Sequence, residues 1–268
     1  MGFVTDPAAA TKQITGWIRE RLQSTGRSQL VLGMSGGIDS ALAAHLAVEA
    51  VGPQALLCVL MPNKTSHPDS LRHAREVIAD LKTNSRELPI TAMAEAFEQN
   101  VTDLSPLRRG NLCARLRMLT LFDQAHANGL VLGTSNKTES LLGYGTLYGD
   151  AAWSLNPLGD LYKTDVWALS KYLGIHPEVI AKAPTADLWE GQTDESELGH
   201  TYAEMDKLLV LLVDEKKSRA ELLRSGIDAK FLDRIVGLIR AFSFKRKLPP
   251  VAWLNPPYST DHLEVQSW

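Results

Sequence analysis

The chain has 268 residues, 44% of them hydrophobic, and a formal net charge of −3. This length suffices for a sizeable core, and the slightly acidic balance argues against nucleic acid as a partner. The first residues lack the basic and apolar stretches of a signal peptide, and no apolar run reaches the length of a membrane span. Cys58 and Cys113 match no CxxC or metal-binding spacing, which indicates buried thiols in a reducing compartment. We therefore expect a cytoplasmic protein without membrane contact.

Apolar periodicity predicts strands that alternate with helices. Strands are expected at 29–33, 55–60, 86–90 and 130–134. Helices are expected at 14–22, 41–52, 69–81, 92–100, 111–126, 164–173, 195–213, 218–225 and 228–247. This alternation predicts an α/β fold with a parallel sheet and helices on both faces. No linker or internal repeat divides the sequence, so we expect residues 1–268 to form a single domain.

The six residues from Ser35 to Ser40 form the most informative motif, Ser-Gly-Gly-Ile-Asp-Ser. They join an expected strand to an expected helix, and the two glycines let backbone N–H groups converge on a ligand. The helix N-terminus behind them favours an anion. Asp39 repels phosphate unless a divalent cation lies between them. The motif therefore predicts a pyrophosphate-binding turn with one magnesium ligand, and Gly133–Thr134, at the end of another strand, is expected to face the same site.

This motif lacks the lysine of a Walker A loop and resembles the SGGxDS loop of the N-type ATP pyrophosphatases, which cleave ATP between its α and β phosphates. The segments 133–150, 155–164, 184–188 and 191–199 resemble the signatures of NAD synthetases. The resemblance implies the Rossmann-like adenine-nucleotide α-hydrolase fold and a homodimer. It also implies the amidation of nicotinic acid adenine dinucleotide (deamido-NAD) to NAD. In that reaction ATP adenylates the nicotinate carboxylate with release of pyrophosphate, and ammonia then displaces AMP.

The resemblance assigns the metal and ATP contacts to the motif residues. Asp39 and Glu139 are the expected Mg²⁺ ligands, and Lys163 is the expected phosphate-binding cation, a point charge suited to a charge that moves during reaction. Asp39, Lys163 and Asp150 are the expected catalytic residues. Asp150 is expected to orient the nicotinate end or ammonia, with a structural turn aspartate as the alternative. The expected ATP-binding residues are Gly33, Met34, Ser35, Gly36, Gly37, Ile38, Asp39, Ser40, Thr134, Lys163 and Thr185.

Contacts with deamido-NAD are expected, by the same resemblance, from Arg115 and Lys245. Arg117 lies two residues after Arg115, so we expect it on another face of the helix, in a structural or interface contact. The chain departs from many bacterial members where these carry lysine, aspartate and histidine. The residues at those positions are Leu147, Ser154 and Phe244. The resemblance therefore defines the contacts with ATP better than those with the dinucleotide.

No segment resembles the amidase domain of glutamine-dependent synthetases, so we expect free ammonia as the nitrogen donor, with a separate glutaminase subunit as the alternative. Two other functions stay open: a related ligase that acts on nicotinic acid mononucleotide, and a non-catalytic adenine-nucleotide sensor of the same fold. An apolar stripe is expected either at the homodimer contact or packed within its own subunit. The stripe consists of Leu208, Leu209, Leu211 and Leu212.

Overall fold

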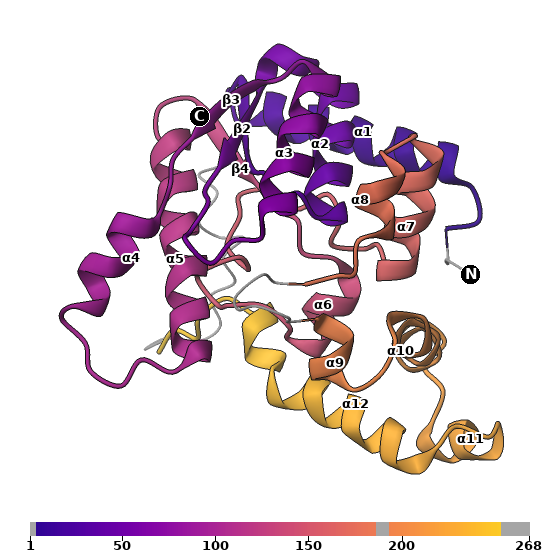
Figure 1. Ribbon diagram of the computed structural model, residues 1–268. Coiled ribbons are helices and arrows are strands. Elements are labelled where there is room, and N and C mark those ends of the chain that lie inside the picture. Colours follow the sequence, from indigo (N-terminus) through magenta and orange to yellow (C-terminus); the bar gives the residue numbers. More distant parts are fainter. Residues whose placement is uncertain (1–3, 186–192, 253–268) are drawn as a thin grey trace.

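The computed structural model describes residues 4–185 and 193–252 (Figure 1). Its centre is a parallel sheet whose strands lie in the order β3-β2-β1-β4. The strands are β1 (Gln29–Gly33), β2 (Leu56–Leu60), β3 (Asn84–Glu87) and β4 (Gly129–Leu132). β1 pairs with both β2 and β4, so Leu32 lies between Cys58 and Leu132. The predicted α/β fold with a parallel sheet is confirmed.

Alternate residues of β1 face two separate hydrophobic clusters, because successive side chains of a strand point to opposite faces of the sheet. Leu30 and Leu32 belong to one cluster and Val31 to the other. The first face is covered by α1 (Pro7–Ser24), α2 (Ile38–Val51), α3 (Pro68–Leu81), α7 (Lys163–Tyr172) and α8 (Pro177–Ala181) (Figure 1). The second face is covered by α4 (Thr91–Glu98) and α5 (Pro106–Ala125). Helices therefore cover both faces, as the sequence predicts.

A third hydrophobic cluster joins α6 to the C-terminal helices, below the sheet layer in Figure 1. Its helices are α6 (Lys137–Leu142), α9 (Asp194–Leu198), α10 (Tyr202–Leu209), α11 (Arg219–Arg224) and α12 (Ala229–Ala241). Leu208 and Leu209 are buried in this cluster, and Leu211 and Leu212 pack against it. The apolar stripe therefore packs within its own chain. Of the helices described, none combines the length and the apolar character needed to cross a membrane.

Element boundaries differ from the predicted ones where capping residues intervene. The predicted helix over 195–213 is divided, because Gly199 adopts the left-handed conformation that ends α9 and Thr201 begins α10 with a capping box. α10 continues into a π-helical turn over Val210–Asp214. The last predicted helix ends at Ala241, and a 3₁₀ turn over Ser243–Arg246 follows it.

Further differences concern the starts of α5 and β3 and two short helices that were not predicted. α5 begins at Pro106 rather than at 111, because Ser105 caps it and proline suits the first helical position. β3 begins at Asn84 rather than at 86. α6 and α8 lie in stretches for which the sequence predicts no helix, and each is too short to show a full apolar period.

Candidate active site

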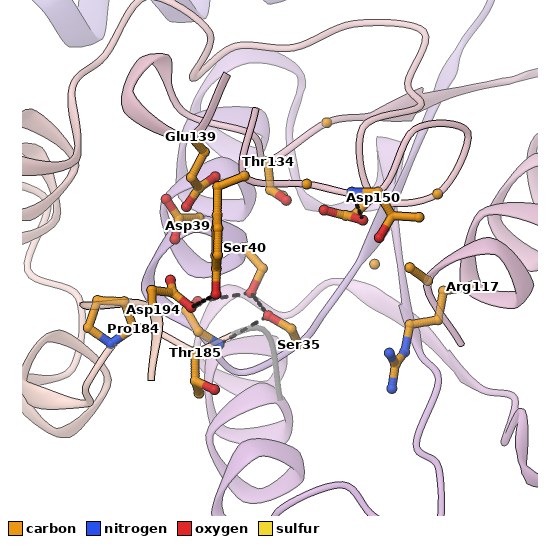
Figure 2. A pocket seen from close by; sticks show the side chains of 18 of the residues that line it. Ser35, Asp39, Ser40, Arg117, Thr134, Glu139, Asp150, Pro184, Thr185 and Asp194 are labelled. Carbon is orange, nitrogen blue, oxygen red and sulfur yellow. Dashed lines mark hydrogen bonds between the residues drawn. The ribbon is translucent and has the colours of Figure 1, made fainter. Parts of the chain in front are cut away.

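A cavity of about 590 Å³ opens where the β1–α2 turn, the segment after β4 and the start of α7 meet (Figure 2). Its position beyond the carboxyl ends of the strands is the expected ligand site of such a sheet. Most of the residues that the sequence indicates line it: Gly33, Met34, Ser35, Gly37, Ile38, Asp39, Ser40, Thr134, Glu139, Asp150, Lys163, Thr185 and Lys245. Gly36 and Arg115 are not among the lining residues. The predicted convergence of the Ser35–Ser40 turn and Gly133–Thr134 on one site is confirmed.

The β1–α2 turn is shaped by its own hydroxyls and glycines. Ser40 Oγ donates to the carbonyl of Gly37 at 2.9 Å and lies 3.0 Å from Ser35 Oγ, which accepts from Gly37 N at 3.2 Å. Gly36 has φ +75°, and a Cβ there would overlap the carbonyl oxygen of Ser70, so glycine is required. Gly37 gives α2 no side-chain cap, and the first N–H groups of this helix are therefore oriented for an anion.

The Lys163 ammonium joins the two predicted metal-binding carboxylates. Nζ lies 2.6 Å from Asp39 Oδ2 and 3.2 Å from Glu139 Oε1. The Lys163 side chain is 2% exposed, whereas those of Asp39 and Glu139 are 19% and 17% exposed. Asn136 aligns both carboxylates, since its Nδ2 donates to Asp39 Oδ1 at 3.1 Å and its backbone N–H donates to Glu139 Oε2 at 3.3 Å. The starts of three helices, α2, α6 and α7, thus bring this cluster together.

Negative charge exceeds positive charge in the cluster. Burial raises the pKa of Glu139, Lys163 opposes this rise, Asp39 and Asp194 add to it, and the resulting pKa is about 8. Burial lowers the pKa of Lys163, but Asp39 and Glu139 outweigh burial and the net shift is upward, so Lys163 is a cation at neutral pH. A further cation at this place would stabilise the ionised form of both carboxylates.

Sequence reasoning gave no role to Tyr144, Asp194 and Tyr202, which lie close to Lys163. The ring centroid of Tyr202 is 5.2 Å from Lys163 Nζ, and the Tyr202 hydroxyl donates to Asp194 Oδ2 at 2.9 Å. The Tyr144 hydroxyl donates to Glu197 Oε2 at 2.6 Å and also lies 3.1 Å from Asp194 Oδ1. Asp194 lines the cavity (Figure 2). Tyr144 and Asp194 belong to the recognised segments, but their pairing across the fold leaves no trace in a single sequence.

Lys182 is a further cation of the cavity wall that the sequence did not indicate. Its Nζ donates to Ser70 Oγ at 2.7 Å, and the carbonyl of Ser70 borders Gly36. Lys182 therefore lies beside the phosphate-binding turn, on the side formed by the start of α3. Lys182 lies just before the segment 184–188, and this position was the indication in the sequence that it could belong to the site.

The two arginines of α5 line different cavities. Arg117 lines the cavity (Figure 2), and its Nε donates to the carbonyl of Met61 at 3.2 Å. Arg115 Nε donates to the carbonyl of Leu147 at 3.3 Å, and the residue lines a separate cavity of about 270 Å³ together with Phe97. Spacing along a helix separates the two faces but does not say which face meets the site. The role of Arg115 in binding deamido-NAD stays a prediction.

Asp150 and Lys245 make contacts that shape the glycine-rich segment after α6. Asp150 Oδ1 accepts from Thr146 N at 2.8 Å, which is the contact of a turn aspartate, while the residue also lines the cavity. Lys245 Nζ donates to the carbonyls of Gly143 and Gly145 at 2.8 and 2.7 Å. Burial lowers the pKa of Lys245, and Asp150 opposes this shift. Both side chains thus fix this segment, and their roles in substrate binding or catalysis stay predictions.

Known proteins resemble this chain over most of its length. A family model described as NAD synthase matches residues 10–249. An NH₃-dependent NAD⁺ synthetase of Fusobacterium nucleatum is 49% identical over 241 residues, which cover 90% of this chain and 93% of the relative.

Two solved structures share the fold. One is described as NMN synthetase from Francisella tularensis; it is 34% identical, has a TM-score of 0.82, and the match covers 92% of this chain and 98% of that one. The other is described as NH₃-dependent NAD synthetase from Campylobacter jejuni in complex with the nitrate ion; it is 33% identical, has a TM-score of 0.80, and the match covers 93% and 100%. The family model matches most of the chain, and the relative is 49% identical over 90% of it. This chain therefore belongs to the NAD synthase family.

Proposed function

We propose that this chain catalyses the ATP-dependent amidation of deamido-NAD to NAD with free ammonia. The observation that carries the proposal is the cluster of Asp39, Lys163 and Glu139, which lies beside a turn suited to phosphate in one cavity. A carboxylate is a poor electrophile, and two anions must meet before it is activated, so a site for this reaction must supply cations, here Lys163 and a divalent ion that Asp39 and Glu139 would hold next to phosphate. The Fusobacterium nucleatum relative, which is named NH₃-dependent NAD⁺ synthetase, matches 90% of the chain.

The chain's own residues would act in two steps. In the first step the nicotinate carboxylate attacks the α-phosphorus of ATP, the bond to the β-phosphate oxygen breaks, and pyrophosphate leaves into the turn formed by Ser35, Gly37 and Ser40. Lys163, held in place by Asp39 and Glu139, would stabilise the negative charge that develops on the leaving pyrophosphate. In the second step ammonia attacks the acyl carbon, AMP leaves with the electron pair of the C–O bond of the mixed anhydride, and the extra proton of the new amide passes to solvent.

The donor set of this site fits Mg²⁺. Two carboxylates, Asp39 and Glu139, face the cavity, and Mg²⁺ in proteins takes one or two such ligands together with phosphate oxygens and water. Burial, with smaller contributions from Asp39 and Asp194, raises the pKa of Glu139, and a divalent cation bound there would stabilise its ionised form. Bound to these residues, the metal would neutralise phosphate charge and polarise the phosphoryl oxygens.

Two acids present the same nicotinate carboxylate, deamido-NAD and nicotinic acid mononucleotide. The Francisella tularensis neighbour is described as an NMN synthetase, and this favours the mononucleotide as the second candidate substrate. The test incubates the purified protein with ATP, Mg²⁺ and ammonium and with each acid in turn. We expect NAD, AMP and pyrophosphate in equal amounts with deamido-NAD. A larger kcat/KM for the mononucleotide would replace the proposed substrate, and ATP recovered unchanged with both acids would support a sensor.

We further propose that the protein is cytoplasmic and homodimeric. The Leu208–Leu212 stripe is used within the chain, so a dimer contact must lie elsewhere. α4 and α5 support such a contact, because they expose large apolar side chains, among them Phe97 at 46% and Leu119 at 57%. Sedimentation equilibrium tests the dimer, and a monomeric mass would contradict it.

A further inference from the structure

Asp206 on α10 is a fully buried carboxylate outside the cavity wall, with 0% of its surface exposed. Its Oδ1 accepts a hydrogen bond from the hydroxyl of Thr138, and its Oδ2 accepts one from the backbone N–H of Thr164 at 2.8 Å. An ionised carboxylate is costly to bury, and such a group is retained where its hydrogen bonds fix neighbouring structure. Both partners are first-turn residues of helices that carry site residues.

The partners of Asp206 lie next to the two residues that meet in the site. Thr138 directly precedes Glu139 in α6, and Thr164 directly follows Lys163 in α7. Thr138 Oγ1 also accepts from the backbone N–H of Lys163 at 3.0 Å, so this hydroxyl links the two helices to each other as well as to Asp206. Asp206 and the Thr138 hydroxyl thus bind the backbone of α7 beside Lys163, and Thr138 itself stands next to Glu139 in α6. Lys163 and Glu139 are the residues whose side chains meet in the site.

We propose that Asp206 is a positioning residue that holds Glu139 and Lys163 at their mutual distance, an inference that rests on the proposed roles of these two residues. α6 has only six residues, too few for a helix to keep its place without outside contacts. A loss of the Asp206 contacts would let Glu139 and Lys163 separate. Catalysis that depends on their joint charge at the phosphates is sensitive to displacements of about 1 Å.

A second tie between the same elements gives a matched control. Asp214, in the π-helical turn after α10, accepts from Lys137 Nζ at 3.0 Å and from the Tyr162 hydroxyl at 2.9 Å. Asp214 therefore binds α6 and the start of α7 through side chains, without touching the backbone beside Glu139 or Lys163. If Asp206 merely attached the C-terminal helices to the rest of the chain, the loss of either aspartate would have the same effect on the reaction.

The experiment compares turnover of the full chain, per folded molecule, in five variants. Asp206→Asn keeps the size and one acceptor oxygen, Thr138→Val keeps the shape without the hydroxyl, and Thr138→Ser keeps the hydroxyl. Asp214→Asn is the matched control. Leu232→Ala, in the core of the same helical layer, supplies a loss of stability at an apolar residue that forms none of these hydrogen bonds. Circular dichroism and thermal unfolding establish the folded fraction of each.

We expect kcat to fall about ten- to a hundred-fold in Asp206→Asn and in Thr138→Val. Thr138→Ser should regain most of the rate, and Asp214→Asn and Leu232→Ala should stay within about three-fold of the parent protein, since their contacts lie away from the reacting groups. The double variant Asp206→Asn/Thr138→Val should lose little more than the worse single variant, because both remove the same contact.

Three outcomes would overturn the proposal: an Asp206→Asn rate equal to that of Asp214→Asn, equal rates for Thr138→Ser and Thr138→Val, or losses that multiply in the double variant. Should Asp206→Asn fail to fold, the Thr138 pair decides alone. Lys163→Met and Glu139→Gln are measured in parallel. Full turnover in these two would overturn the proposed roles of the site, whereas their inactivity with a normal Asp206→Asn rate would overturn the positioning role by itself.

Discussion

The substitution Asp39→Asn tests the chemistry of the cluster in a protein that still folds. Asparagine has the same shape but only one oxygen, whereas Asp39 accepts from Asn136 Nδ2 at 3.1 Å through Oδ1 and from Lys163 Nζ at 2.6 Å through Oδ2. The new amide nitrogen therefore faces one of these two donors, while Lys163 keeps its contact with Glu139 at 3.2 Å. We expect the free energy of unfolding to fall by about 1–3 kcal/mol, the cost of leaving one buried donor without an acceptor.

The same substitution removes one of the two carboxylates proposed to hold Mg²⁺ against the phosphates. One preorganised charge contact at a reacting centre is worth ~10²–10³ in kcat, or about 2.7–4 kcal/mol. The assay follows AMP release from ATP with deamido-NAD and ammonium, beside a thermal melt of the same preparation. Asp69→Asn is the matched control, because Asp69 occupies the same second helical position in α3 but is exposed and does not line the cavity. Equal rates in the two variants would refute the reasoning.

Three further predictions concern the turn, the acid substrate and the nitrogen donor. Gly36→Ala should destabilise the protein by several kcal/mol more than Gly26→Ala, measured by chemical unfolding, because both glycines have positive φ but only at Gly36 would a Cβ overlap backbone; similar losses would contradict this. Arg115→Ala should raise the KM for deamido-NAD about ten- to a hundred-fold and leave the KM for ATP unchanged; that pattern in Arg117→Ala instead would assign the contact to the arginine in the cavity. At fixed total ammonium the rate should rise with pH through neutrality, because only deprotonated ammonia is a nucleophile, and glutamine alone should give no NAD; efficient use of glutamine would refute free ammonia as the donor.

β1, β2 and β4 could be predicted because they carry continuous apolar runs, as strands buried on both faces of a parallel sheet do, whereas the edge strand β3 is polar and exposed. The phosphate turn could be predicted because its chemistry lies in six consecutive residues. The division of the helix after 194 was missed, although Gly199 followed by Thr201 is a stop signal and a start signal in sequence. The inward arginine, the Tyr144–Asp194 pair and Asp206 lay beyond prediction for a different reason. Each depends on which helix face meets a distant segment, and single-chain periodicity does not contain that information.

The cavity lies between the sheet clusters and the cluster of α6 and the C-terminal helices, and Trp167 packs against both sides. Its phosphate turn stands on the sheet clusters, whereas Leu198 and Tyr202 belong to the cluster of α9–α12. A transient opening of the C-terminal helices would therefore dismantle the catalytic cluster while the nucleotide fold stayed intact, since cooperative units of a protein open independently. ATP bound in the cavity as proposed would contact both units and suppress that opening, so amide hydrogens of α10 should exchange more slowly in its presence, although α10 lies behind the wall of the cavity. A ligand in the phosphate turn would thereby reduce local unfolding of the C-terminal helices, which lie on the far side of Lys163.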